Sequence, residues 1–351
     1  MKSIKQSNGA KKQFSIFIIC VVIGCFLYSC ASIPKLSKTD KKTIKEVLKA
    51  PVSKVVEGET GFAKNKGHSI WYEKINPDTK VKGTILLIMG NGQDALSWPP
   101  SFISNFTDAG YQVIRYDHRG TGFSKSEEKW KKKKAYSLSD MAEDAVAILE
   151  TLAIEESHII GVSMGGMIGQ IIAIEHPEKA TSLTSIMSSG NVLDPELEPM
   201  SNDVLPKMVS TILNHGFFGN KKGQIKRQII QKRILMGEAT GDIDVETMAK
   251  VATYNLNERK GYNLMAARHH YEAILISESR LEKLRDLEVP TLVIHGKEDP
   301  VMPISHGEKL SATIPDAQSM WIENMGHDLP DAKIKEITDK IISHIQRNKT
   351  R

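Results

Sequence analysis

The stretch HIIGVSMGGMIGQIIAIEHP, residues 158–177, decides the fold of this chain. An apolar, β-branched run typical of a buried strand breaks at GVSMG, and from Met167 apolar residues recur at helical spacing until Pro177. Ser163 thus lies between a strand and a helix, with a glycine two positions away on each side. This pattern indicates a turn so sharp that flanking side chains would collide, on which the serine hydroxyl stands exposed. The alternative is an ordinary turn in which Ser163 caps the helix, so residues elsewhere in the chain must decide.

Two polar residues near the C-terminus qualify as partners of this serine. Asp299 follows the strand-like run TLVIHG at 291–296, and His327 follows the run SMWI at 319–322. In an open parallel sheet the carboxyl ends of the strands share one edge, so both side chains are expected near Ser163. An activated serine needs a base within hydrogen-bond reach and an acid that orients the base. A turn-forming Asp299 and a loop His327 are the alternatives, but the order of the three residues favours a functional set.

From about residue 52 the chain alternates strand-like and helical segments, which predicts an α/β fold with a mostly parallel sheet covered on both faces. The segment 52–75 is expected to form an antiparallel hairpin that leads into the sheet. The helix at 139–152 is expected to begin with Ser139 as its N-cap. The strand-like runs are Thr84–Met89, Tyr111–Tyr116, His158–Val162, Leu183–Met187, Thr291–Ile294 and Met320–Ile322.

The alternation lapses between residues 191 and 280, where helical patterns occur without a convincing strand. A helical insertion between two strands of a sheet is the expected form of a cap over a functional site. The predicted core therefore comprises residues 52–190 and 281–351, and the predicted cap comprises 191–280. A wholly separate domain at 191–280 is the alternative.

The first thirty residues differ in character from the rest of the chain. Lysines precede an apolar run from Phe14 to Tyr28, which is short for a bilayer span and typical of a secretory signal. The ending LYSC resembles a bacterial lipobox, in which Cys30 is lipidated and residues 1–29 are removed. We therefore expect a signal peptide at 1–29, a tether at 30–51, and a membrane-anchored lipoprotein of the bacterial cell envelope, on the periplasmic or outer-membrane side. An uncleaved N-terminal anchor helix is the alternative.

Composition and motif spacing limit the ligands that the chain is expected to bind. The 351 residues are 40% hydrophobic and 25% charged, which is typical of a globular protein, and a net charge of +5 gives no reason to expect nucleic acid. Cys20 and Cys25 lie in the segment to be discarded, so Cys30 is best explained as an attachment point. No cluster has metal-ligand spacing and no strand opens onto a G-x-G-x-x-G loop, so neither a metal nor another cofactor is predicted.

A further element belongs to the same edge of the predicted sheet. The run TILLIMG at 84–90 leads into Asn91-Gly92, a turn early in the sheet. Enzymes with this serine turn stabilise a developing oxyanion with the amide after the nucleophile, here that of Met164, and with an amide from this loop. Backbone N–H groups suit that role because they are fixed dipoles that need no reorganisation.

These motifs give the chain, from about residue 52 to its end, a resemblance to the α/β-hydrolase superfamily. The matching motifs are GVSMGG, VIRYDHRGTGFS, TLVIHGKEDPVMP and ENMGHDLP. The stretch LLIMGNGQDALSWPPSF is similar to the branch that contains aclacinomycin methylesterase, which cleaves a methyl ester from a polyketide. In that branch the loop begins with Met-Gly, as it does here. The resemblance implies an α/β-hydrolase fold with a helical cap.

The resemblance also implies roles for individual residues. Ser163 would be the nucleophile, and Asp299 and His327 its partners. The backbone N–H groups of Asn91 and Met164 would form the oxyanion hole. The implied activity is that of a lipid-anchored serine hydrolase, which cleaves small-molecule carboxylic esters, methyl esters among them, through an acyl-enzyme.

The same residues leave some other activities of the superfamily open and disfavour others. Perhydrolase, thioesterase, lactonase and carbon–carbon hydrolase chemistry would use the same three side chains and stay open. Haloalkane dehalogenases and epoxide hydrolases are disfavoured because they place an aspartate where this chain has Ser163. Proline iminopeptidases are disfavoured because they usually carry a tryptophan where it has Met164. A catalytically silent binding protein is disfavoured because such proteins generally lose a member of the triad.

Several conspicuous segments favour a structural interpretation. Asp117–Arg119 is expected in a structural loop near the site, and His269-His270 on the surface or in packing. The run Lys131–Lys134 is expected in a solvated loop. The basic helix near Lys226–Arg233 is expected to cover the pocket as part of the cap, with a membrane-surface helix as the alternative.

Overall fold

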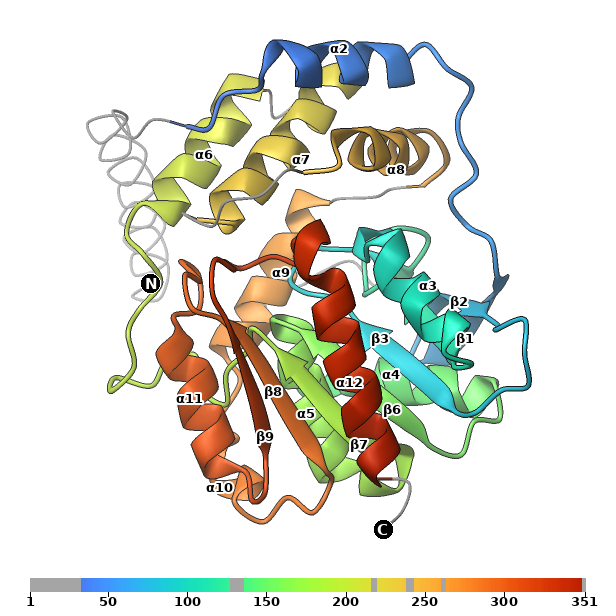
Figure 1. Cartoon of the computed structure of the whole chain (residues 1–351), viewed down its shortest axis with the longest axis vertical. Coiled ribbons are helices and arrows are strands. Elements are labelled where there is room, and N and C mark those ends of the chain that lie inside the picture. The colour runs from blue at the N-terminus through green and yellow to red at the C-terminus, as the bar shows by residue number, and fades with distance from the viewer. Residues whose placement is uncertain (1–32, 127–135, 216–219, 238–242, 260–262, 349–351) are drawn as a thin grey trace, which may run out of the picture.

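The computed structural model describes residues 33–126, 136–215, 220–237, 243–259 and 263–348 (Figure 1). The expected signal peptide, Cys30 and the run Lys131–Lys134 lie outside these ranges, so the predictions made for them stay predictions. Within the described ranges, no helix combines the length and the apolar character needed to cross a bilayer.

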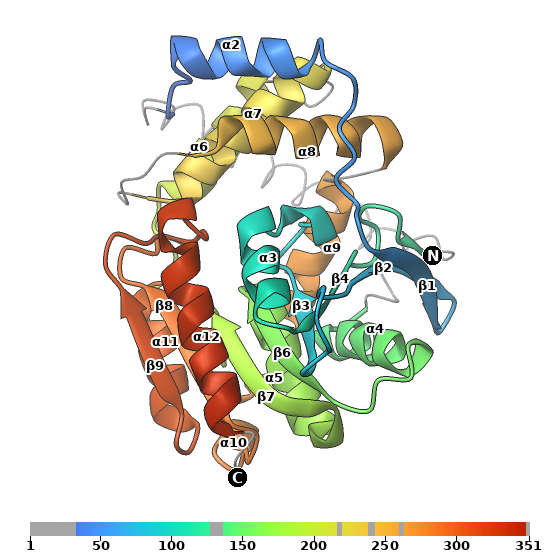
Figure 2. The ribbon, with the colours of Figure 1, turned by 45° about the vertical axis from the view of Figure 1, so that its right-hand side comes forward.

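One sheet organises the core (Figures 1 and 2). Its strands follow the order β1-β2-β4-β3-β6-β7-β8-β9, and the short β5 pairs with β2. Neighbours from β4 to β9 are parallel, whereas β1 and β2 form an antiparallel hairpin and β2 is antiparallel to β4. The strands are β1 (Glu59–Asn65), β2 (His68–Ile75), β3 (Thr84–Ile88), β4 (Gln112–Tyr116), β5 (Lys125–Ser126), β6 (Ser157–Val162), β7 (Ala180–Ile186), β8 (Thr291–Gly296) and β9 (Gln318–Ile322). The predicted hairpin and the mostly parallel sheet are confirmed.

Helices cover both faces of the sheet, as the sequence predicts. Because side chains alternate along a strand, Leu87 and Ile160 face one way and Leu86 and Ile159 the other. α3 and α12 cover the first face, and α4, α5 and α11 the second. The helices that flank the sheet are α3 (Pro100–Asp108), α4 (Leu138–Thr151), α5 (Met164–Glu175), α10 (Leu281–Leu284), α11 (Ile304–Thr313) and α12 (Ile334–Asn348).

The chain between β7 and β8 forms a helical layer above the carboxyl edge of the sheet (Figures 1 and 2). Its helices are α6 (Val204–His215), α7 (Lys221–Leu235) and α8 (Val245–Glu258). The same insertion continues into α9 (Leu264–Leu275), which lies below this layer and packs Ala273 and Ile274 into the core cluster of α4 and α5 (Figure 2). The basic helix predicted near Lys226–Arg233 is α7, and it buries Ile225, Ile229 and Ile230 inside this layer. Its apolar side is therefore packed against other helices and is not free to lie on a membrane.

The expected tether at 30–51 is wrong over most of its described length, because it contains a helix that is part of the cap. Helix α2 (Lys38–Val47) begins with a capping box, in which Ser37 Oγ accepts from Asp40 N–H at 3.0 Å and Asp40 Oδ2 accepts from Ser37 N–H at 2.7 Å. Ile44 and Val47 are buried against α7 and α8. Arg233 of α7 forms an ion pair with Asp40 at 3.0 Å, so apolar packing and a charge pair both fix α2 to the cap.

The predicted start of α4 is also corrected, because the capping residue lies two positions earlier than expected. The N-cap is Ser137 and not Ser139, because Ser137 has an extended backbone and its Oγ accepts from Asp140 N–H. Asp140 Oδ2 accepts from Ser137 N–H at 2.9 Å in return. A carboxylate at the third helical position completes this reciprocal cap, which Ser139 does not have.

The packing of α2 leads to a stability prediction. Ile44→Ala removes a fully buried side chain between helices, and we expect it to destabilise the protein by about 2–4 kcal/mol. Lys42→Ala on the same helix is the matched control, because the Lys42 side chain is 77% exposed and forms an ion pair with an exposed Glu46. Thermal and urea unfolding of both variants would make the comparison. Equal stability of the two would contradict the docking of α2 on the cap.

Candidate active site

Ser163 lies on a strained turn between β6 and α5. Its backbone has φ 55° and ψ −119°, and its side chain makes no capping hydrogen bond, so the alternative of an ordinary capping serine is excluded. A side chain at Gly161 would lie 2.1 Å from the carbonyl oxygen of Gly165. One at Gly165 would lie 2.0 Å from the carbonyl oxygen of Ile88. Both flanking glycines are therefore required by backbone contacts, as the sequence pattern indicates.

The structure brings the three sequence-predicted side chains into one chain of hydrogen bonds. His327 Nε2 lies 3.0 Å from Ser163 Oγ, and His327 Nδ1 lies 2.7 Å from Asp299 Oδ2. Each residue follows a different parallel strand, β6, β8 or β9, at the carboxyl edge of the sheet. In this arrangement Asp299 accepts the Nδ1 proton of His327, which leaves Nε2 free to take the proton of the serine.

Asp299 is held as a buried carboxylate. Its Oδ1 accepts the backbone N–H groups of Val301 and Met302, both at 2.8 Å. Burial alone would favour the neutral acid, but the adjacent His327 and a contact with His295 hold the pKa of Asp299 well below its ordinary value. The carboxylate is therefore charged at neutral pH, the state that fixes the tautomer of the histidine.

The loop that carries His327 is tied to the cap. The backbone N–H of His327 donates to the carbonyl of Leu235, at the end of α7, at 2.8 Å. Lys232 of α7 pairs with Asp328 at 2.6 Å. The position of the histidine backbone thus depends on the cap as well as on β9.

The expected oxyanion donors come from two backbone segments beside the serine. Met164 is the first residue of α5, so its N–H has no acceptor within the helix. Asn91 lies in a turn closed by a hydrogen bond from Gln93 N–H to the Gly90 carbonyl at 3.2 Å. A side chain at Gly90 would lie 3.9 Å from Ser163 Oγ, which shows how closely this turn approaches the nucleophile.

The conformation of this turn separates Asn91 from its neighbour. Gly92 has a positive φ of 69°, whereas the φ of Asn91 is not positive. The N–H of Gly92 is already used, because it donates to His270 Nδ1 at 3.1 Å. No acceptor for the N–H of Asn91 is found in the described part of the chain, which leaves it as the donor available from this loop.

Sequence reasoning missed the role of two buried histidines. His270 was expected on the surface or in packing; it is fully buried and packed, and it is also hydrogen-bonded to the turn at Gly92, which was not expected. His118, expected in a structural loop, binds the carbonyl of Met89 through its Nε2 at 2.8 Å. Nothing in the sequence pattern links position 270 to position 92, and the HH pair offered the only signal.

The neighbours of His118 have structural contacts, in line with the interpretation of this loop. Asp117 accepts the backbone N–H groups of Ala95 and Phe123 and forms a fully buried ion pair with Arg259 of the cap. Arg119 pairs with Asp144 of α4. These contacts fix the loop after β4 beside the turn at Asn91.

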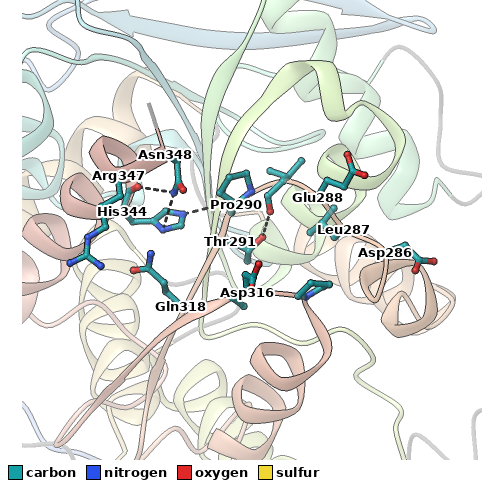
Figure 3. Close-up of a pocket in the computed structure, with 13 residues that line it drawn as sticks. Asp286, Leu287, Glu288, Pro290, Thr291, Asp316, Gln318, His344, Arg347 and Asn348 are labelled. Carbon is teal, nitrogen blue, oxygen red and sulfur yellow. Dashed lines mark hydrogen bonds between the residues drawn. The ribbon is translucent and has the colours of Figure 1, made fainter. Parts of the chain in front are cut away.

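A cavity of about 830 Å³ lies at the opposite edge of the sheet (Figure 3). Its lining includes Pro290 and Thr291 at the start of β8, Gln318 at the start of β9, and His344 on α12. Ser163 follows the carboxyl end of β6, so the strands of the sheet separate this cavity from the serine. Within the described residues, no group of three or more His, Cys, Asp and Glu side chains is placed to hold a metal ion.

Known proteins resemble this chain in sequence, and solved structures resemble it in fold. Two curated relatives are rhodomycin D methylesterase DauP of Streptomyces sp. (strain C5), 29% identical over 79% of this chain and 94% of that protein, and rhodomycin D methylesterase DnrP of Streptomyces peucetius, 28% identical over 81% and 97%. Among solved structures, an esterase from Exiguobacterium antarcticum covers 83% of this chain and 100% of its own with a TM-score of 0.63 and 17% identity. A meta-cleavage product hydrolase from Pseudomonas fluorescens IP01 covers 84% and 99% with a TM-score of 0.61 and 19% identity.

A family model fits most of the chain. The model described as alpha/beta hydrolase fold matches residues 83–332, a range that includes Ser163, Asp299 and His327. The chain therefore belongs to the alpha/beta hydrolase fold family and is a hydrolase of that family.

Proposed function

We propose that this protein hydrolyses carboxylic esters through an acyl-enzyme on Ser163. The observation that carries the proposal is the hydrogen-bonded chain Ser163–His327–Asp299 on a strained turn, beside two backbone N–H groups, of Asn91 and Met164, for which the described residues supply no acceptor. As Ser163 Oγ attacks the ester carbonyl, His327 Nε2 takes its proton, and the N–H groups of Asn91 and Met164 stabilise the oxyanion. The intermediate collapses, and the departing alcohol receives the proton from His327.

The second half of the reaction reuses the same groups. Water gives a proton to His327 Nε2 as its oxygen attacks the acyl carbonyl, and the second tetrahedral intermediate meets the same two donors. Its collapse releases the carboxylic acid and returns the proton to Ser163. Asp299 stays charged throughout and stabilises the imidazolium that forms twice in the cycle.

Small esters, methyl esters included, are the substrate class that the relatives favour. Two relatives, which match this chain over nearly their whole length at 28–29% identity, are named rhodomycin D methylesterases. The cap helices α6–α9 contribute the surface above the serine, and it is their side chains that would select the acyl and alcohol groups. A panel of p-nitrophenyl esters of rising chain length, methyl esters, a thioester and a lactone would identify the preferred bond.

We also propose that the protein is anchored to a bacterial envelope membrane through a lipid on Cys30. The support is the sequence pattern of residues 1–30. Ile33, the first described residue, follows Cys30 by three positions, so about 11 Å of chain at most separates them. Because α2 packs on the cap soon afterwards, such an anchor would place the cap end of the molecule at the membrane surface.

Ser163→Ala tests the nucleophile. The variant should lose ester hydrolysis and labelling by a serine-directed fluorophosphonate, because no other group replaces the attacking oxygen. Its thermal unfolding should match that of the wild type, since Ser163 Oγ contacts His327 and supports no packing. A folded variant that keeps more than a few per cent of wild-type turnover would remove Ser163 from the mechanism.

The pair Asn91→Ala and Asn91→Pro tests the loop donor. Alanine keeps the N–H and deletes a buried Oδ1 that has no partner among the described residues, so kcat should change little. Proline deletes the N–H at the second position of a turn whose third residue is Gly92 at positive φ, a place where proline is accepted. Losing one oxyanion donor costs about 10²–10³ in kcat, and we expect that loss with KM less affected. If a folded proline variant turns over as fast as the alanine variant, the second donor lies elsewhere.

Cys30→Ser tests the anchor. Mass spectrometry of the mature wild type should find an acylated N-terminus at Cys30, and the variant should retain residues 1–29 because lipidation precedes cleavage at a lipobox. An N-terminus at Met1, or a cleavage elsewhere without acyl groups, would refute the anchor and leave the proposed hydrolysis untouched.

A further inference from the structure

A side chain of the cap, that of His270 on α9, hydrogen-bonds to the loop at 89–92. Its Nδ1 accepts the N–H of Gly92 at 3.1 Å. Its Nε2 lies 3.0 Å from the carbonyl oxygen of Arg119 and can only donate there. The ring is therefore neutral with its proton on Nε2, because a proton on Nδ1 would face the N–H of Gly92.

A second histidine contacts the other end of the same loop. His118, after β4, donates from Nε2 to the carbonyl of Met89 at 2.8 Å. The rings of His118 and His270 pack edge to face, with centroids 5.5 Å apart. One ring thus holds a carbonyl at the start of the loop and the other holds an amide at its end, and the peptide N–H of Asn91 lies between these two points in the chain.

Both rings sit where a charge is disfavoured. Each is at most 1% exposed. Burial lowers the pKa of His118 to about 4, and burial together with the nearby His118 lowers the pKa of His270 to about 3. At neutral pH both are therefore fixed in the one tautomer that these hydrogen bonds need.

Helices α8 and α9 of the cap have additional contacts with the same side of the core. Asn263, the N-cap of α9, donates from Nδ2 to the Gly120 carbonyl at 3.1 Å. Asn255 of α8 donates from Nδ2 to Asp94 Oδ2 at 3.0 Å, just after the loop. His270 therefore reaches Gly92 from a fixed support.

We propose that His118 and His270 are positioning residues that hold the loop 89–92 in its oxyanion-binding conformation. Within the described ranges, neither histidine is hydrogen-bonded to Ser163, Asp299 or His327, and both act through the backbone that presents the N–H of Asn91. In this arrangement α9 has a second function, because its His270 holds the oxyanion loop in place. The inference rests on the proposed ester hydrolysis and goes beyond it by assigning a catalytic function to the cap.

The two histidines use opposite ring nitrogens toward the loop, and this allows a crossed test. Asparagine places its amide near the position of Nδ1, and glutamine places its amide near that of Nε2. His270→Asn keeps an acceptor for Gly92, whereas His270→Gln loses it. His118→Gln keeps a donor for Met89, whereas His118→Asn loses it.

With the best ester from the substrate panel, kcat should fall about 10- to 10²-fold in His270→Gln and His118→Asn, because the oxyanion donor is displaced. In His270→Asn and His118→Gln, kcat should stay within about threefold of the wild type, and KM should change little in all four variants. The affinity of a boronic acid, whose serine adduct is tetrahedral, should fall in parallel with kcat. His344→Gln is the matched control for loss of a buried histidine, because His344 lies at the opposite edge of the sheet, bonded to the Pro290 carbonyl.

The outcomes distinguish failure of the positioning role from failure of the proposed ester hydrolysis. If the wild type hydrolyses esters but His270→Asn and His270→Gln have equal kcat, the positioning role is overturned. If the wild type hydrolyses no ester, the proposed function fails first. Should a variant not fold, ¹⁵N NMR of the wild type keeps the inference testable, because His270 must show a neutral ring protonated on Nε2 between pH 5 and 8, and an imidazolium there would overturn it.

Discussion

The contact between Gly165 and the carbonyl of Ile88 is the constraint on which the rest of the site depends. It lets the first turn of α5 press against the end of β3, which brings Ser163 beside the loop that β3 feeds. A non-glycine residue at positive φ costs on the order of 1–3 kcal/mol, so Ser163 keeps its conformation only because the surroundings over-determine it. Those surroundings are the hydrogen bonds from Ser163 N–H to Ile186 and from Ser188 Oγ to the Ser163 carbonyl. The strain aims the hydroxyl, and the same close approach places two backbone amides beside it.

The cap is attached to both of the loops that surround the serine. α7 accepts the backbone N–H of His327 at its C-terminal end, and α9 holds Gly92 through His270. α2 is in turn packed on α7 and α8. A disturbance of the cap would therefore reach the base and the oxyanion loop by two separate hydrogen bonds, even where no cap side chain touches the substrate.

The buried strands and the three reacting side chains were predictable because each depends on local sequence. Buried parallel strands are short apolar runs, and Ser163, Asp299 and His327 each follow one directly, so topology alone brings them to one edge. Helix α2 was not predictable from composition, since its many lysines hide the buried positions Ile44 and Val47, which matter only when α7 and α8 are present. His270 was missed for the same reason. Its partner lies 178 residues earlier in the chain, and a hydrogen bond to a backbone amide leaves no pattern in the sequence.

The buried charges near the oxyanion loop explain why neutral histidine rings suit its support. Three buried ion pairs lie close by, those of Arg115 with Glu73, Arg119 with Asp144 and Arg259 with Asp117. Removing one partner of such a pair leaves an uncompensated charge and typically costs about 3–5 kcal/mol. A neutral imidazole offers one donor and one acceptor on a rigid ring without adding to this charge balance.

The lowered pKa values have a consequence for stability. Because the unfolded chain binds protons at its histidines below about pH 6.5 and the folded His118 and His270 do not until about pH 4 and 3, folding stability falls as the pH drops through that interval. The hydrogen bonds that hold the oxyanion loop survive across the same interval. The loop thus gains a geometry that is insensitive to pH at the expense of a fold that is sensitive to it.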